Sequence, residues 1–253
     1  MHLINRQQGP EGASRTIGES ELYIEKQGKV DVYKLENDSL VQTSSFAIAN
    51  KVPYSIGTVQ ELRPDVYIYP DIYDFPGMRE FHIMDTNKRQ CTSKGTYPED
   101  DKRFKRREDF KGAYMHSLQV KPDKSAFVVV YSQLRRIRIY DKEGELCHDI
   151  FLENEVGNYK VVPQKPSERY WHFGQSVVTD NYIYLLNPDK LGIAAAKPRC
   201  NILVLDWDGN LVARYKLNVW VYDFFVDEVN NIIFGSCWGN LKKDVFFSLN
   251  LLM

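Results

Sequence analysis

The sequence predicts an all-β protein built from five copies of one unit of strands. The first observation is periodicity. Residues 126–131 and 136–140 are rich in β-branched and aromatic side chains, and the second segment alternates between polar and apolar positions. The second observation is that no stretch combines a helix N-cap, a long amphipathic stripe and a C-cap. The third is that one order of strands and turns recurs along the chain.

The repeating unit is a strand, an Asp-containing turn, a second strand, a short link and a third strand that ends in Asp. The clearest copy runs from Leu118 to Gly144, with Pro122-Asp123 in its first turn and Lys142-Glu143-Gly144 in its last. Proline presets φ in a turn and glycine accepts a positive φ, so both segments suit turns. The five copies begin near Ile17, Leu62, Leu118, Val177 and Phe224.

The spacing of about 40 to 65 residues between copies predicts a β-propeller with five recognisable blade units. A β-sandwich or open barrel is the alternative, but neither predicts the same Asp turn in successive units. The copies cover nearly the whole chain, so we expect a single propeller domain over residues 1–253. We expect residues 2–5 to complete the last blade and remove an exposed edge; the rival is a six-bladed ring that lacks one blade.

Composition excludes several classes of protein. The chain is 43% hydrophobic, with 33 basic and 34 acidic side chains, which is typical of a globular protein and excludes intrinsic disorder. The formal charge of −1 differs from the net positive charge that is typical of nucleic-acid-binding proteins. No apolar run approaches the roughly 20 residues that span a bilayer, and no signal peptide is visible. We therefore expect neither a nucleic-acid partner nor a membrane span.

The cysteines and histidines predict structural roles. The four cysteines form no CxxC pair, which favours buried structural thiols over a zinc site or a disulfide framework. Cys91 and Cys147 each lie six residues after an Asp that ends an apolar run, so they occupy equivalent positions of two units. The five histidines contain no HxH or HExxH arrangement, so we expect no metal site.

Large polar aromatic side chains stand just before the first strand of three units, which predicts a ligand site at the mouth of the central channel. Aromatic faces beside His and Tyr polar atoms suit a carbohydrate, a peptide or a protein surface. The alternative is that these side chains pack between blades. The candidate ligand-binding residues are Tyr114, His116, Trp171, His172, Trp220, Tyr222 and Asp223.

The predicted function is a non-catalytic binding or scaffold module without a cofactor; the alternative is a channel-centred hydrolase or lyase, with or without calcium. Calcium needs about six to eight oxygen ligands, and the candidates are Asp180, Asn181, Asp223 and Asp227. Asp180 and Asp227 occupy the repeated turn, where Asp usually bonds nearby backbone. No catalytic motif is present, so we assign no catalytic residues. The basic run over residues 102–107 has acidic flanks and is typical of a solvated loop.

The segment Arg6-Gln7-Gln8-Gly9-Pro10-Glu11 resembles the Gly-Pro-Gly-Glu-like turn of bacterial TolB-like six-bladed propellers, although it lacks the second glycine. The turns around Asp123 and Asp141 are similar to the blade signatures of the same group. The resemblance implies a six-bladed ring, here without its first blade. It also implies a setting in the periplasm or cell envelope.

Overall fold

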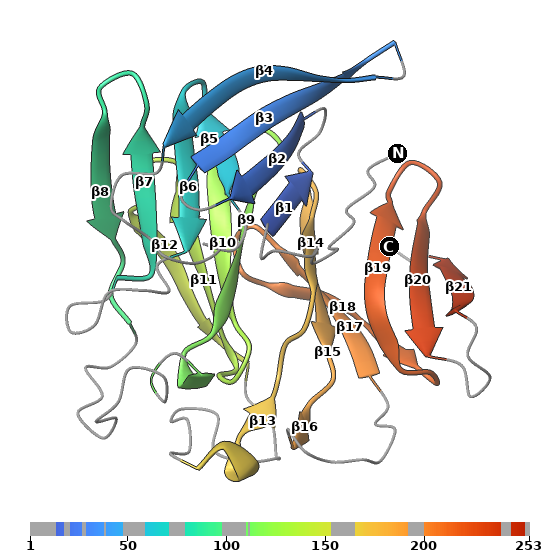
Figure 1. Cartoon of the computed structure of the whole chain (residues 1–253). Coiled ribbons are helices and arrows are strands. Elements are labelled where there is room, and N and C mark those ends of the chain that lie inside the picture. Colours follow the sequence, from blue (N-terminus) through green and yellow to red (C-terminus); the bar gives the residue numbers. More distant parts are fainter. Residues whose placement is uncertain are drawn as a thin grey trace. The chain divides into compact units, whose positions relative to one another are not determined.

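The computed structural model describes residues 14–17, 21–26, 29–37, 39–47, 59–70, 79–97, 110, 112–152, 165–191, 200–238 and 244–250. These residues are almost entirely strands that form antiparallel sheets (Figure 1). The chain divides into two compact units. The first contains residues 2–100 with 141–145, and the second contains residues 101–140 with 146–253, together with residue 1.

The first compact unit holds two four-stranded sheets in which the strands follow one another in chain order. One sheet consists of β1 (Ser14–Ile17), β2 (Glu21–Lys26), β3 (Lys29–Glu36) and β4 (Ser39–Ala47). The other consists of β5 (Gln60–Arg63), β6 (Val66–Pro70), β7 (Phe81–Asp85) and β8 (Gln90–Lys94).

The second compact unit holds three further sheets of the same meandering kind. The first has β9 (His116–Val120), β10 (Ala126–Tyr131), β11 (Arg136–Asp141) and β12 (Leu146–Phe151). The next has β14 (Ser176–Val178), β15 (Tyr182–Asn187), β17 (Cys200–Asp206) and β18 (Leu211–Leu217). The last has β19 (Val221–Asp227), β20 (Ile232–Trp238) and β21 (Asp244–Asn250).

The five predicted blade units are confirmed, because each corresponds to one of these sheets. The sequence did not reveal the fourth strand of four sheets. Strand β4 is exposed along almost its whole length and β12 along about half, so neither carries a strong apolar pattern. Residues 2–5, expected to complete the last blade, lie outside the described residues, as does the basic run over residues 102–107.

The repeated Asp closes the hairpin turn between the third and fourth strands. Oδ1 of Asp141 accepts the backbone N–H groups of Glu143 and Glu145, each at 2.9 Å. Oδ1 of Asp206 accepts that of Asn210 at 2.7 Å. The glycines of these turns have the expected positive φ, 82° at Gly144 and 86° at Gly209. The turn chemistry that defined the repeat is therefore confirmed.

In the second compact unit, strand β17 of the β14–β18 sheet is buried on both faces. From β17, Leu203 and Leu205 join a core cluster with Val128 and Ile139 of the β9–β12 sheet. The alternate residues of β17 join a second cluster with side chains of the β19–β21 sheet. These are Ile202 and Val204, which lie in that cluster with Val221, Phe224 and Ile233. Because successive side chains of a strand point to opposite faces, this strand is an unbroken apolar run rather than an alternating one.

In the first compact unit, one core cluster joins side chains of its two sheets. It includes Val30 and Val32 from β3 and Tyr67 and Tyr69 from β6. The ring of Phe46 from β4 stacks on Tyr67 with centroids 4.2 Å apart. This contact explains why Phe46 is the half-buried residue of an otherwise exposed strand.

The prediction that the cysteines are buried is wrong for two of the three that are described as free. Cys200 is buried, but Cys91 is only partly buried and Cys147 is exposed. Both lie at equivalent places on outer strands, β8 and β12, as the repeat predicted. An outer strand covers less apolar surface than an inner one, so its side chains remain partly in solvent.

Candidate functional site

Two tryptophans, one in β13 (Tyr170–Trp171) and one just before β19, lie on one lysine ammonium in the second compact unit. Nζ of Lys190 is 4.2 Å from the ring centroid of Trp220 and 6.0 Å from that of Trp171. Trp171 is 41% exposed, which is unusual for so large an apolar side chain. The arrangement, called the Trp–Lys–Trp site below, contains two of the predicted ligand-binding residues and one that the sequence analysis did not single out.

A short ribbon positions Trp171 beside Lys190. It consists of β13 (Tyr170–Trp171) and β16 (Lys190–Leu191), in which Trp171 pairs directly with Lys190. The ribbon continues the β14–β15 pair beyond its end. Between the two, the backbone N–H of Gly174 donates to Leu186, and that of Leu186 donates to Gln175. The indole N–H of Trp171 donates to the carbonyl of Phe173 at 2.6 Å, which fixes the ring.

A buried ion pair lies directly behind the lysine. Arg135 pairs with the carboxylate of Asp189, and the two side chains are 6% and 16% exposed. Nδ1 of His172 lies 2.8 Å from the other carboxylate oxygen, Oδ1. Asp189 has a φ of 47°, a left-handed conformation that Asp adopts more readily than most residues. The contacts of Asp189 with Arg135 and His172 therefore fix the turn that carries Lys190.

His172 is a neutral donor in this cluster. Burial and the positive charge of Arg135 lower the pKa of His172 from 6.5 to about 4. Nε of Arg135 is 3.3 Å from Nδ1 of His172, and one nitrogen cannot both accept from Arg135 and donate to Asp189. The shorter contact takes precedence, so Nδ1–H donates to the carboxylate. Burial and the nearby Arg214 lower the pKa of Arg135 to about 10, which leaves it charged at neutral pH.

The lowered pKa of His172 predicts a pH dependence of stability. Between about pH 6.5 and pH 4 the unfolded chain takes up a proton at His172 that the folded chain does not. The free energy of unfolding should therefore fall over this window, by up to about 3 kcal/mol, and be unaffected by this group above it. The measurement is urea unfolding at half-unit pH steps. His172→Asn, which keeps a donor but does not titrate, should remove most of the fall in the free energy of unfolding between pH 6.5 and pH 4. The same pH dependence in the variant as in the wild type would contradict the assignment.

The other predicted aromatic segment is packed inside the same compact unit. Tyr114 is 3% exposed and its ring lies 4.6 Å from that of Phe110. Nδ1 of His116 is 3.0 Å from the carbonyl of Tyr114, and the His116 ring lies 5.5 Å from that of Tyr131. These two candidates therefore sit behind the surface, with partners of their own.

Hydrogen bonds join residues in or next to the three predicted segments. The carbonyl of Ser132 accepts the backbone N–H of His172 at 2.8 Å, and the N–H of Ser132 donates to Met115. Oε1 of Gln175 accepts the backbone N–H of Phe224 at 2.7 Å, which ties the third segment to the second. Neighbouring sheets are thus joined near the Trp–Lys–Trp site by directed polar contacts as well as by apolar packing.

The remaining candidates precede or begin β19. Trp220 is half-buried, and Asp223 is exposed and pairs in register with Ser236. The register shifts between Val221 and Asp223, which places Tyr222 at an irregularity of the strand. The side chain of Tyr222 lies outside the described residues.

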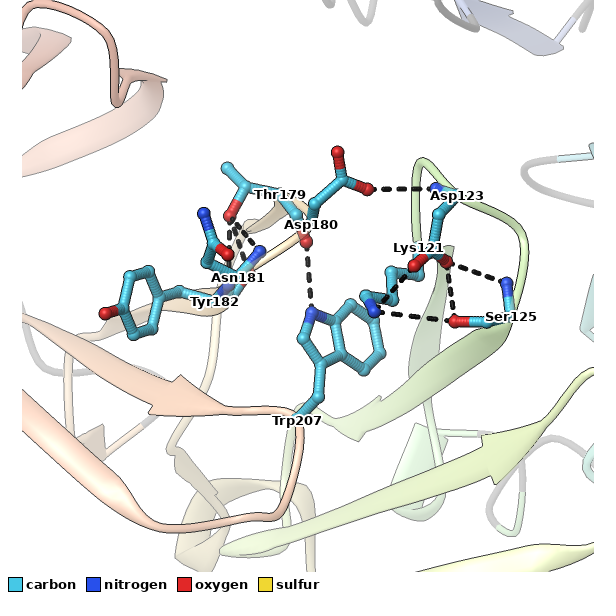
Figure 2. A network of polar contacts seen from close by, with 8 residues as sticks. All are labelled: Lys121, Asp123, Ser125, Thr179, Asp180, Asn181, Tyr182 and Trp207. Carbon is cyan, nitrogen blue, oxygen red and sulfur yellow. Dashed lines mark hydrogen bonds and ion pairs between the residues drawn. The ribbon is translucent and has the colours of Figure 1, made fainter.

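Two of the candidate calcium ligands, Asp180 and Asn181, belong to a network of polar contacts between turns (Figure 2). Oδ1 of Asp180 accepts the backbone N–H of Asp123 at 3.0 Å, so it bonds the turn of another sheet rather than nearby backbone as expected. The indole of Trp207 donates to the carbonyl of Thr179 at 3.0 Å, and Nζ of Lys121 lies 5.6 Å from its ring centroid. These contacts tie three turns of the second compact unit together.

Glu228 extends this network to the β19–β20 turn. Its carboxylate accepts from the Thr179 hydroxyl at 2.6 Å, the Tyr184 hydroxyl at 2.9 Å and the Asn181 amide at 3.1 Å. Asp227 has the predicted turn role, since it accepts the backbone N–H of Asn230 at 3.0 Å. Three of the four candidate calcium ligands thus make hydrogen bonds within or between turns.

Within the described residues, no group of three or more His, Cys, Asp or Glu side chains could hold a metal ion. No helix among these residues is long and apolar enough to cross a membrane.

Comparison with known proteins identifies the fold. The chain resembles the crystal structure of a DUF4221-family member from Bacteroides vulgatus, at 12% identity and a TM-score of 0.55, over 98% of this chain and 82% of that one. It also resembles KlAtg21, solved in complex with the coiled coil of AgAtg16, at 11% identity and a TM-score of 0.58, over 93% of this chain and 64% of that one. The fold is of the β-propeller type. No family model and no curated protein matches the sequence.

Sequence reasoning missed the charged half of the site. Lys190, Asp189 and Arg135 did not stand out, because single charged residues in loops are common. The one available signal was the turn sequence Asn187-Pro188-Asp189-Lys190, which begins a long insertion between two strands. Only the pairing of β13 with β16 shows that this turn lies against Trp171.

Proposed function

We propose that this chain is a non-catalytic binding or scaffold module whose ligand contacts the Trp–Lys–Trp site. One observation carries the proposal: a cation and two indoles from distant parts of the sequence meet where Trp171 remains 41% exposed. Exposed aromatic side chains held in place by surrounding structure are typical of binding surfaces, because they bury much area at little entropic cost.

The buried side chains behind the site support this proposal. Arg135, Asp189 and His172 hold the turn that carries Lys190, and the indole N–H of Trp171 is already bonded. A ligand would therefore meet side chains that need little further ordering, which favours affinity. Tyr222 and Asp223 remain proposed ligand contacts, whereas Tyr114 and His116 are buried and pack within the same compact unit.

The sequence also indicates the extent of the domain, the related group of propellers and the class of partner. We propose one propeller domain over residues 1–253, related to the TolB-like group, with a carbohydrate, a peptide or a protein as its partner. The repeated Asp turns and the opening turn around Pro10 support this relation.

The experiment is a thermal-shift screen of neutral, acidic and basic sugars and peptides against the wild-type chain, Trp171→Ala and Trp220→Ala. A ligand at one hundred times its Kd stabilises the fold by about 2.7 kcal/mol, which raises Tm measurably. We expect at least one ligand to raise the wild-type Tm and to lose most of that effect in Trp171→Ala.

Phe234→Ala is the matched control, since Phe234 is 42% exposed and belongs to β20. It should leave the ligand-induced shift unchanged. The proposal fails if Trp171→Ala and Trp220→Ala retain the full shift for every ligand found, or if no ligand gives a shift. A large loss of Tm in the unliganded Trp171→Ala protein would show that Trp171 serves packing.

A further inference from the structure

The charge at the Trp–Lys–Trp site is open to an outside partner. Lys190 contacts two indole faces and has no carboxylate or hydrogen-bond partner among the described residues. Elsewhere in the same compact unit, Lys121 has Asp123 and Lys165 has Glu168 within salt-bridge distance. Lys190 therefore differs from these lysines in having no carboxylate beside its ammonium among the described residues.

The carboxylate next to Lys190 in the chain is already neutralised. Asp189, the residue before Lys190, pairs with Arg135 and accepts from His172, and all three side chains are at most 16% exposed. The positive charge of Arg214 lies close enough to Arg135 to lower the pKa of Arg135. Asp189 thus faces two cationic side chains, Arg135 and Arg214, and the charge of Lys190 remains to be balanced by an anion from outside.

The indoles define what must accompany the anion. Both ring centroids lie within 6.0 Å of Nζ of Lys190, so a ligand that pairs with the ammonium lies beside both indoles. The apolar C–H face of a pyranose ring packs well on an indole face, whereas a free inorganic anion would leave both rings uncovered. Lys190 supplies a point charge that pairs equally well with a carboxylate or a phosphate.

We infer that the Trp–Lys–Trp site binds an anionic sugar, a pyranose ring that bears a carboxylate or a phosphate, with Lys190 as the anion's partner and Trp171 and Trp220 as the platforms for the ring. This inference rests on the proposed function and names its ligand class.

The experiment is ligand-observed saturation-transfer NMR on the full chain with three probes: methyl glucuronide, glucose 6-phosphate and methyl glucoside. We expect at least one of the two anionic sugars to bind about tenfold more tightly than the neutral one, because hydrogen bonds to charged groups are the stronger ones. Which of the two anionic probes binds better distinguishes a carboxylate from a phosphate. Added salt should weaken the binding.

Variants assign the effect to Lys190. Lys190→Gln should weaken binding of the anionic probe about tenfold and leave any neutral-sugar signal unchanged, while Lys190→Arg should retain most of the affinity. Lys216→Gln removes an exposed charge on β18 and is the matched control, with no expected effect. Trp171→Ala should reduce the signal of all probes.

The inference is overturned if neither anionic sugar binds, if methyl glucoside binds as well as they do, or if Lys190→Gln has no effect. The proposed function is tested separately. If the thermal-shift screen finds a neutral or cationic ligand that depends on Trp171, the site binds ligands but not anionic sugars. If no ligand depends on Trp171, both proposals fail.

Discussion

Asp189→Asn is expected to lower the free energy of unfolding by about 3 kcal/mol, since it leaves the charge of Arg135 buried without its partner. Asparagine keeps the shape of the side chain, tolerates the left-handed backbone at φ 47°, and can still accept from Nδ1–H of His172. The loss should therefore report the missing charge rather than a changed backbone. The measurement is urea unfolding at pH 7.5, where His172 is neutral in both states.

A double variant tests the cause of this loss. Arg135→Met removes the unpaired charge, so Arg135→Met with Asp189→Asn should be more stable than Asp189→Asn alone. Additive losses from the two substitutions would show that the pair does not interact. A loss below about 0.5 kcal/mol in Asp189→Asn, which is ordinary for surface substitutions, would contradict the buried ion pair itself.

Glu228→Ala is expected to lower the free energy of unfolding by about 3 kcal/mol. The carboxylate of Glu228 accepts hydrogen bonds from three side chains, and one donor, the hydroxyl of Tyr184, belongs to a residue with 0% exposure. Removing the acceptor leaves a buried hydroxyl without its partner, which costs about 1–3 kcal/mol, and two further bonds are lost. The measurement is the urea midpoint at pH 7.5.

Two further variants test whether the loss in Glu228→Ala comes from its hydrogen bonds or only from the removal of a negative charge. Asp208→Ala, which removes an exposed carboxylate from the β17–β18 turn, should change stability by less than about 0.5 kcal/mol. Tyr184→Phe combined with Glu228→Ala should cost less than the sum of the single variants, because the hydroxyl no longer lacks an acceptor. Equal losses in Glu228→Ala and Asp208→Ala would show that the contacts of Glu228 contribute nothing particular.

Local sequence patterns were sufficient to place the inner strands. The run over residues 202–205 is apolar at every position because β17 contributes to two core clusters, one on each face. Such a run marks a buried strand whatever its neighbours are. The outer strand β4 carries no such pattern, since its exposed positions accept polar and apolar residues alike. It was therefore found only through its pairing with β3.

The candidate site was predictable only in its aromatic half. Trp171 and Trp220 attract attention because the chain has only four tryptophans and these two stand before inner strands, whereas Lys190 is one of 33 basic residues. The sequence also suggested a local turn role for Asp180, which instead bonds the backbone of Asp123 in another sheet. Contacts between residues far apart in the chain leave no spacing signal.

By itself, the sequence determined the all-β class, the number of recognisable blade units and the residues of their turns. These follow from short-range rules: the side-chain period of a strand, the φ of proline and the positive φ of glycine. Only the tertiary structure decided that Lys190 lies between two indoles and that Asp189 neutralises Arg135. Both are decided by which strands pair and which sheets pack, and those contacts join residues that are distant in sequence.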